Sequence, residues 1–128
     1  MEDAVVKTVA GFLNTEGGTL LIGVNDAGEP VGLGYDTPLV KPPSADGFVN
    51  WLTTHLTNAL THAAVTRTRA RIDQVGNLQI CRVDVAESSV PVYARMSTKG
   101  DNVFWVRMNN STRALPEIEI EEYVRDHW

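Results

Sequence analysis

The sequence predicts one α/β (α+β) domain, residues 1–128, in which a mixed, largely antiparallel sheet is flanked by helices. The length of 128 residues suits a single hydrophobic core. Apolar residues recur at helical spacing near both ends and in the middle of the chain. The segments between them are short, strand-like runs bounded by turn residues.

The first element is predicted to be a helix at residues 2–14. Asp3 is a suitable N-cap, and Gly17-Gly18 is a suitable stop because glycine adopts the left-handed conformation that ends helices. The predicted core face consists of apolar residues at helical spacing: Val5, Val6, Val9, Phe12 and Leu13.

A buried strand is expected next, in the continuous apolar run TLLIGV at 19–24. The turn-forming residues 25–28 (Asn-Asp-Ala-Gly) follow it directly. Residues 30–33 are therefore predicted to return as the second arm of a hairpin. Residues 34–43 are expected to form a loop.

A second helix is predicted at residues 44–64, with Ser44 as its N-cap and an apolar stripe facing the sheet. His55 and His62 lie seven positions apart, which is not the i+3 or i+4 spacing of metal ligands on a helix. We therefore predict no metal site on this helix.

The strand at residues 66–72 carries the clearest basic stripe. Its residues alternate with a period of two, so that Arg67, Arg69 and Arg71 share one face. A turn at Gly76-Asn77 then leads into the returning strand LQICRVDV.

The remaining elements are two short strands and a closing helix. The strands are expected at 90–96 and 102–108, divided by a turn at 98–101. The helix is expected at 116–127, and Glu117 and Glu119 in its first turn suit the positive end of the helix dipole.

The composition excludes several classes of protein. The apolar runs are far shorter than the roughly 20 residues that cross a bilayer, and no signal sequence is apparent. Cys81 is the single cysteine, which excludes an internal disulfide and a multi-cysteine zinc site, and no activating base is apparent for it. We expect a cytoplasmic protein that makes no membrane contact.

Charge is segregated along the chain although the net charge is -5. Residues 65–115 contain eight basic and four acidic residues, whereas both flanks are acidic. This asymmetry is typical of a basic binding face, and a solvated strand surface is the alternative interpretation.

Self-contained catalytic motifs are absent: the sequence has no phosphate-binding loop, GxGxxG, GxSxG, HExxH or CxxC pair. Three other stretches are informative when read in order. They are AVVKTVAGFLNTEGGTLLIGVNDAGEPVGL, SVPVYAR and VFWVRMNNSTRAL. Together they resemble the Schlafen AlbA_2 family, whose pattern includes Phe-x-Asn-Thr-x-Gly-Gly, a Pro-Val-Tyr segment and a closing Ser-Thr-Arg.

The resemblance implies a nucleic-acid-binding domain with the Schlafen AlbA_2-like fold, of a kind often called a transcriptional regulator in bacteria. The family pattern usually opens with a strand that carries two glutamates, and this chain begins after that element. We therefore expect the chain to be a fragment of a longer protein. Asn25 and Asn109 stand where the family commonly has an acid and a glycine.

Catalytic Schlafen proteins are ribonucleases, and the resemblance places one of their metal-binding acids at Asp26. One carboxylate cannot hold the divalent ions that phosphodiester cleavage needs. We predict no catalytic residue and no cofactor for this chain alone, and Asp26 is otherwise interpreted as a turn residue. A metal-dependent ribonuclease remains the alternative for a longer protein, with the other acids upstream.

The favoured hypothesis is a module that binds phosphates of DNA or RNA within a larger regulatory protein. Ser111-Thr112-Arg113 following Arg107 suits a phosphate, and a capped turn before the last helix is the alternative. A self-association or protein-interaction module, such as a homodimer, is the third hypothesis. The predicted nucleic-acid contacts are Arg67, Arg69, Arg71, Arg95, Arg107, Ser111, Thr112 and Arg113.

Overall fold

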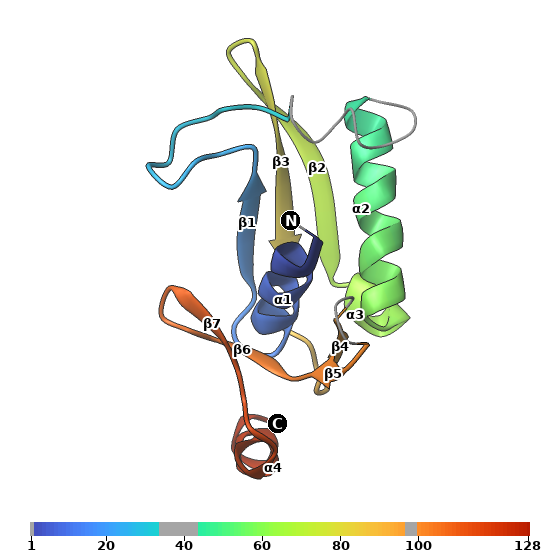
Figure 1. The fold of residues 1–128 in the computed structure, drawn as a ribbon, viewed down its shortest axis with the longest axis vertical. Coiled ribbons are helices and arrows are strands. Elements are labelled where there is room, and N and C mark those ends of the chain that lie inside the picture. Colours follow the sequence, from blue (N-terminus) through green and yellow to red (C-terminus); the bar gives the residue numbers. More distant parts are fainter. Residues whose placement is uncertain (1, 34–43, 97–99) are drawn as a thin grey trace.

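The computed structural model describes residues 2–33, 44–96 and 100–128, and it has the predicted α/β class (Figure 1). The expected loop at 34–43 and part of the expected turn at 98–101 lie outside the described residues. In chain order the elements are α1 (Glu2–Leu13), β1 (Gly18–Ile22), α2 (Ala45–Ala59), α3 (His62–Val65), β2 (Thr68–Val75), β3 (Leu78–Val85), β4 (Ala94–Arg95), β5 (Asn102–Val103), β6 (Trp105–Met108), β7 (Ser111–Ala114) and α4 (Glu117–His127).

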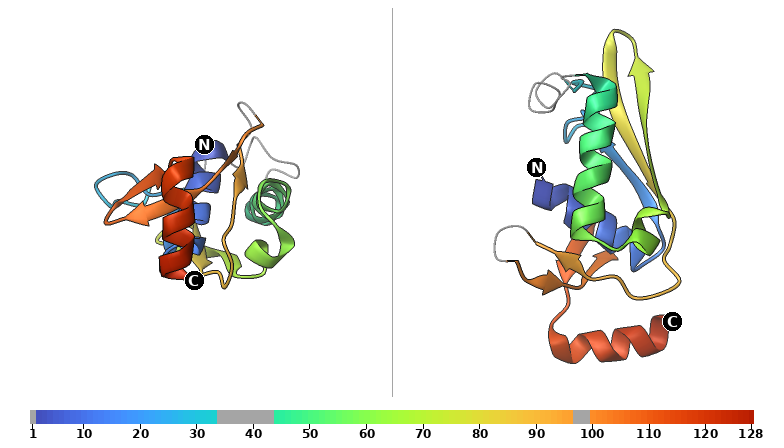
Figure 2. Two further views of the ribbon diagram at one scale, coloured as in Figure 1. Left: turned by 90° about the horizontal axis from the view of Figure 1, so that it is seen from below. Right: turned by 90° about the vertical axis from the view of Figure 1, so that its right-hand side faces the viewer.

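The main sheet has the strand order β1-β3-β2, and both pairings are antiparallel. Its register places Leu20, Val83 and Ala70 side by side on one face. Helices α1 and α2 lie on that side of the sheet, as the right-hand view of Figure 2 shows. The core between these layers contains Val9, Leu13, Phe48, Leu52, Leu56, Cys81 and Val83.

The opposite face of this sheet carries polar side chains. The register places Thr19, Asp84 and Arg69 in one row across the three strands and Leu21, Arg82 and Arg71 in the next. We call these six residues the open face. Side chains alternate between the two faces of a strand, so a core on one side leaves every second residue to the other side.

This one-sided core explains why the prediction of a buried first strand was wrong. Leu21 is 45% exposed because β1 is an edge strand and alternates between the two faces. The predicted second arm at 30–33 does not form a strand, and only a single bridge joins Val24 to Pro30. The predicted cap Asp3 lies inside the first turn, because α1 begins at Glu2.

The predicted second helix is divided into α2 and α3. Ser44 caps α2 as expected, accepting a hydrogen bond of 3.1 Å from the backbone of Gly47. The helix stops at Leu60, whose backbone is extended. Thr61 then accepts a hydrogen bond from the Ala64 amide, so that a new cap starts a new helix where continuation was predicted.

The strands of the last third are shorter than the sequence predicts. The β4–β5 and β6–β7 pairs form separate two-stranded sheets, and Phe104 lies between β5 and β6. Ser111 begins a strand, β7, and the alternative interpretation as a capped turn is wrong. Asn109 in the β6–β7 turn has a positive φ of 57°, the left-handed conformation that glycine adopts more easily.

Candidate functional site

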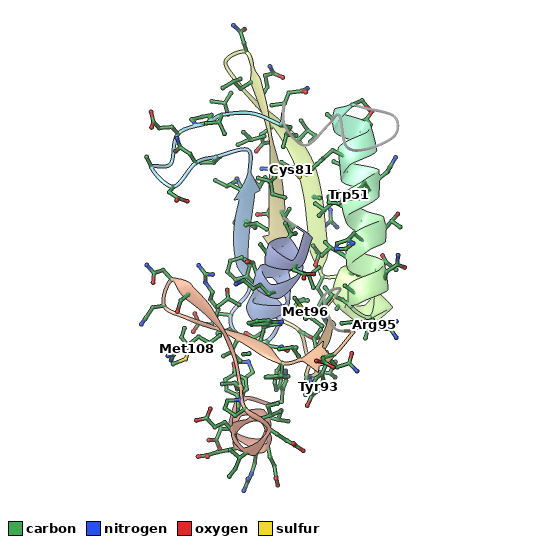
Figure 3. The ribbon with its side chains drawn as sticks, viewed as in Figure 1. Trp51, Cys81, Tyr93, Arg95, Met96 and Met108 are labelled. Carbon is green, nitrogen blue, oxygen red and sulfur yellow. The ribbon has the colours of Figure 1, made fainter. Side chains whose placement is uncertain are left out.

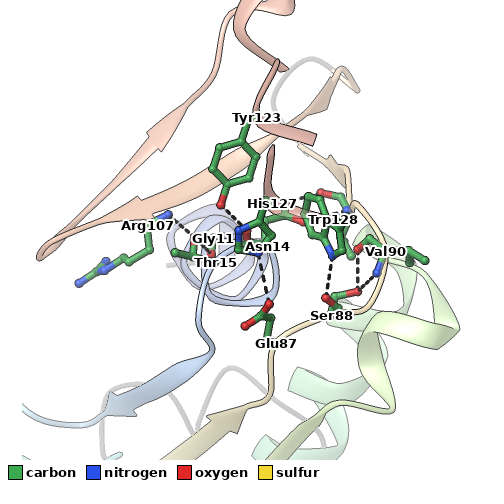
Figure 4. A network of polar contacts seen from close by, with 11 residues as sticks. Gly11, Asn14, Thr15, Glu87, Ser88, Val90, Arg107, Tyr123, His127 and Trp128 are labelled. Atoms are coloured by element: carbon green, nitrogen blue, oxygen red, sulfur yellow. Dashed lines mark hydrogen bonds and ion pairs between the residues drawn. The ribbon is translucent and has the colours of Figure 1, made fainter. Parts of the chain in front are cut away.

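Asn14, at the end of α1, is buried and holds three distant segments together (Figure 4). Its side-chain amide donates to the carbonyls of Val92, at 2.7 Å, and Trp105, at 2.9 Å. Its side-chain oxygen accepts from the Val92 amide at 2.8 Å. Every polar atom of this buried side chain is therefore paired with the backbone of a distant segment.

Thr15 and Tyr123 extend this junction. The Thr15 hydroxyl donates to the Gly11 carbonyl and accepts from the Arg107 amide at 2.9 Å. The Tyr123 hydroxyl donates to the Asn14 carbonyl at 2.5 Å, and burial raises the pKa of Tyr123. We call Asn14, Thr15 and Tyr123, with the backbone they bind, the motif junction. It joins the three stretches that carry the family resemblance, so their shared residues have a structural role here.

The motif junction also anchors α4, which has no buried residue of its own. The Trp128 indole donates to the Ser88 carbonyl at 2.9 Å, and the ring of Tyr123 lies edge-on to Phe104 with the centroids 5.8 Å apart. His127 lies 3.3 Å from the Glu87 carboxylate. The last helix is therefore held by a few side chains at its C-terminal end.

The open face brings together two of the predicted arginines, Arg69 and Arg71, with a third that the sequence analysis did not select. Arg82 on β3 lies directly opposite Arg71. Its place could not be predicted, because the alternation in LQICRVDV shows only that Arg82 and Asp84 share a face. The pairing of β2 with β3 and its register place Arg82 opposite Arg71, and alternation within one strand does not reveal either.

Asp84 is the carboxylate nearest in register to Arg69, but other groups bind it. Arg82 Nε lies 3.0 Å from Asp84 Oδ1, and the Thr19 hydroxyl donates to the same oxygen at 2.9 Å. These hydrogen bonds, that of Arg82 first, hold the pKa of Asp84 below its usual value. Arg69 therefore has no hydrogen-bond or ion-pair partner within the described residues.

A shallow groove of about 480 Å³ lies beside Arg69. Arg67 lines it as well, and the Arg67 guanidinium donates to the Ser89 hydroxyl at 2.9 Å. Arg71 pairs with Asp73 at 3.4 Å, with 60% of the arginine side chain exposed. Exposed pairs of this kind contribute at most about 1 kcal/mol, so a phosphate could replace Asp73 at little cost.

The predicted phosphate site at Arg107, Ser111, Thr112 and Arg113 does not form one cluster. Arg107 is opposite Thr112 in register and donates to its hydroxyl at 2.8 Å, while Arg113 is opposite Val106. Arg107 and Arg113 thus point to opposite faces of the hairpin. The Arg107 guanidinium also lies over the Phe12 ring, 5.3 Å from its centroid.

A groove of about 690 Å³ lies between this hairpin and α4. Its charged lining consists of Arg107 and Arg113 with Glu119, Glu122 and Asp126 of α4. Three carboxylates outnumber the two guanidinium groups, and Arg107 already donates to Thr112, so the groove disfavours a phosphate. This groove is therefore a poorer phosphate site than the open face.

Arg95 lies apart from both arginine groups, next to Tyr93 on the other side of α1 from Met108 (Figure 3). Three aromatic residues lie in this part of the chain, and of these Tyr93 is 45% exposed. Phe104 is buried in the core, and Trp105 is half-buried, with its indole nitrogen 3.4 Å from the Met96 sulfur. Tyr93 is therefore the most exposed of these three rings.

The predicted turn role of Asp26 agrees with the structure. The side chain of Asn25 accepts hydrogen bonds from the Ala27 and Glu29 amides, and Asp26 is exposed at the tip of this turn. Across residues 2–33, 44–96 and 100–128, no group of three or more His, Cys, Asp and Glu side chains could hold a metal ion. No helix in the described ranges has the length and apolar character needed to cross a bilayer.

Comparisons with known proteins agree with this fold. The sequence model of the family described as "Schlafen, AlbA_2" matches residues 1–116. A comparison with curated proteins finds no significant match.

Two solved structures are similar to the chain. The DIP2311 protein from Corynebacterium diphtheriae matches with a TM-score of 0.67 and 20% identity over 98% of this chain, which spans only 19% of that protein. The second is the N-terminal domain of a protein from Nitrosomonas europaea that is named for its relation to the ATP-dependent DNA helicase RecG. It matches with a TM-score of 0.54 and 26% identity over 89% of this chain and 76% of that domain.

Proposed function

Because the chain belongs to the Schlafen AlbA_2 family, we propose that it is a nucleic-acid-binding domain that contacts phosphates through the open face of the sheet. In this proposal it acts in the cytoplasm, within a larger regulatory protein. Binding DNA or RNA in this way needs no cofactor.

The unpartnered charge of Arg69 is the observation that carries the proposal. It lies on a sheet face that α1 and α2 leave uncovered, next to Arg67 and close to Arg71 and Arg82. Guanidinium groups bind phosphate oxygens with short, charge-assisted hydrogen bonds. The relation of the N. europaea domain to a DNA helicase, as named, also supports a role with nucleic acid.

The net charge of -5 limits the kind of binding to expect. The acidic residues of both flanks repel a long polyanion, and only a local basic surface offsets them. We therefore expect modest affinity that does not depend on base sequence and that falls steeply as salt rises.

The proposal is tested by fluorescence-anisotropy titration of labelled single-stranded and duplex DNA and RNA at two salt concentrations. Arg69→Ala should weaken binding roughly tenfold to every ligand that binds. It should also reduce the slope of log affinity against log salt concentration by about one. Arg125→Ala is the matched control, since it removes the same charge from an exposed position on α4. Its affinity should equal that of the parent chain.

Two outcomes oppose the proposal. If the parent chain binds none of the four ligands at low salt, it is not a nucleic-acid-binding domain by itself. If both variants lose affinity equally, net charge controls binding and the open face is not the site.

A further inference from the structure

A groove of about 640 Å³ lies between the end of α2 and the β4–β5 strand pair, away from the open face. No acidic side chain lines it within the described residues. Its lining residues come from three segments and include Asn58, Thr61, Pro91, Tyr93, Arg95 and Asn102.

Tyr93 supplies an accessible aromatic ring in a fixed position. The ring meets Phe104 edge-on, with the centroids 5.3 Å apart and an angle of 63° between the planes. Phe104 is itself only 1% exposed, so the Tyr93 ring packs against the core. A ring held in this way loses little freedom when a flat ligand stacks on it.

Three polar side chains stand around that ring. Tyr93 and Arg95 are exposed on either side of the buried Ala94, so both side chains project away from the core. The register places Asn102 directly opposite Arg95. Asn58 reaches the groove from α2. In the part of the chain that the structure describes, the side chains of Asn58, Arg95 and Asn102 have no hydrogen-bond or ion-pair partner.

This set of groups matches the parts of one nucleotide. An aromatic ring binds the face of a base, a carboxamide both donates to and accepts from its edge, and a guanidinium binds phosphate. A base inside a duplex has both faces covered by its neighbours, so only an unpaired base can stack on Tyr93.

We infer that this groove binds an unpaired nucleotide of single-stranded DNA or RNA, with its base on Tyr93 and its phosphate on Arg95. The inference rests on the proposed function, to which it adds a preference for single strands. Arg67 lies between the open face and this groove, because its hydrogen bond to Ser89 places it beside the segment that leads to Tyr93.

The test compares Tyr93→Leu with Tyr93→Phe, using a short labelled oligothymidine strand and a duplex of equal length at low salt. Leucine retains apolar contact with Phe104 but has no ring, whereas phenylalanine retains the ring. Tyr93→Leu should weaken binding of the single strand about tenfold, the effect expected when one base loses its stacking partner. Duplex affinity should not change, and Tyr93→Phe should bind both ligands as the parent does.

Ile118→Ala is the matched control, since Ile118 is an apolar side chain, 86% exposed, on α4 and does not line the groove. Arg95→Ala should weaken the single strand selectively, and it provides a second test if Tyr93→Leu fails to fold. Circular dichroism checks the fold of each variant.

The outcomes separate this inference from the proposed function. In one outcome the parent binds the single strand, Arg69→Ala weakens this binding, and neither Tyr93→Leu nor Arg95→Ala changes it. The groove is then not a nucleotide site, whereas the open face remains the phosphate site of the proposed function. Equal loss of single-strand and duplex affinity in Tyr93→Leu also overturns the inference. A parent chain that binds neither ligand overturns both.

Discussion

Asn14 and Val92 bind each other through two hydrogen bonds of opposite direction: the Asn14 amide donates to the Val92 carbonyl, and the Val92 amide donates to the Asn14 side-chain oxygen. Both residues are buried. The side chain of Asn14 thus replaces the strand partner that the backbone at Val92 lacks. Inside the motif junction it satisfies groups that would be costly to bury alone.

Asn14→Ala should therefore destabilise the domain by about 2–4 kcal/mol, because it leaves buried groups of Val92 and Trp105 without partners. Urea unfolding followed by tryptophan fluorescence measures the loss. Asn50→Ala, at an exposed position of α2, is the control and should change the unfolding free energy by less than about 0.5 kcal/mol. Equal effects of the two substitutions would contradict the structural role of the motif junction.

Gly17→Ala tests the close approach between the end of α1 and β3. Gly17 has a φ of 77°, and a Cβ there would lie 2.5 Å from the Val85 carbonyl oxygen. Gly28 has a similar φ of 81° with nothing near its Cβ position. Gly28→Ala should cost about 1 kcal/mol through backbone strain alone, and Gly17→Ala should cost at least about 1 kcal/mol more. Thermal unfolding of both variants gives the comparison.

Cys81 should make stability depend on alkaline pH. Burial, assisted by the nearby charge of Asp73, raises the pKa of the thiol from 9.0 to about 11. The folded state therefore binds this proton more tightly, so the stabilisation is complete below pH 9.0 and is lost as pH rises through about 11. Urea unfolding from neutral to alkaline pH should show a steeper decline for the parent than for Cys81→Ala. An equal decline of the unfolding free energy in the two proteins would argue against a raised pKa of Cys81.

Asp84→Asn should increase affinity for nucleic acid. The substitution removes a negative charge from the open face and frees Arg82, whose Nε is 3.0 Å from the carboxylate in the parent. We expect roughly two- to fivefold tighter binding at low salt, and a smaller gain at high salt. Asp126→Asn on α4 removes an equal charge elsewhere and should have little effect in the same titration.

Much of the fold could be predicted because local chemistry determined it. Ser44 caps α2, and Gly76-Asn77 turns β2 into β3 as their residue types indicate. The division of α2 from α3 was missed because the capping hydroxyl of Thr61 competes with an apolar stripe that continues through it. The cap at Thr61 predicts a new helix and the apolar stripe predicts one continuous helix, so the stripe alone did not reveal that α2 ends before Thr61.

The candidate site was less predictable, because it depends on register and on contacts between distant segments. Alternation alone placed Arg69 and Arg71 on one face, but the approach of Arg82 to Asp84 leaves Arg69 unpartnered. Neighbours in sequence were also misleading at the hairpin. Thr112 and Arg113 are adjacent, yet they lie on opposite faces of β7.

The motif junction has a consequence for the order of events during synthesis. The bonds of Asn14 reach across 78 positions to Val92, 91 to Trp105 and 109 to Tyr123. Helix α1 therefore leaves the ribosome well before the groups that complete its end. We therefore expect the C-terminal end of α1 to stay incompletely packed until α4 has been synthesised. A nascent chain stalled before Tyr123 should expose the end of α1 to chaperones and proteases.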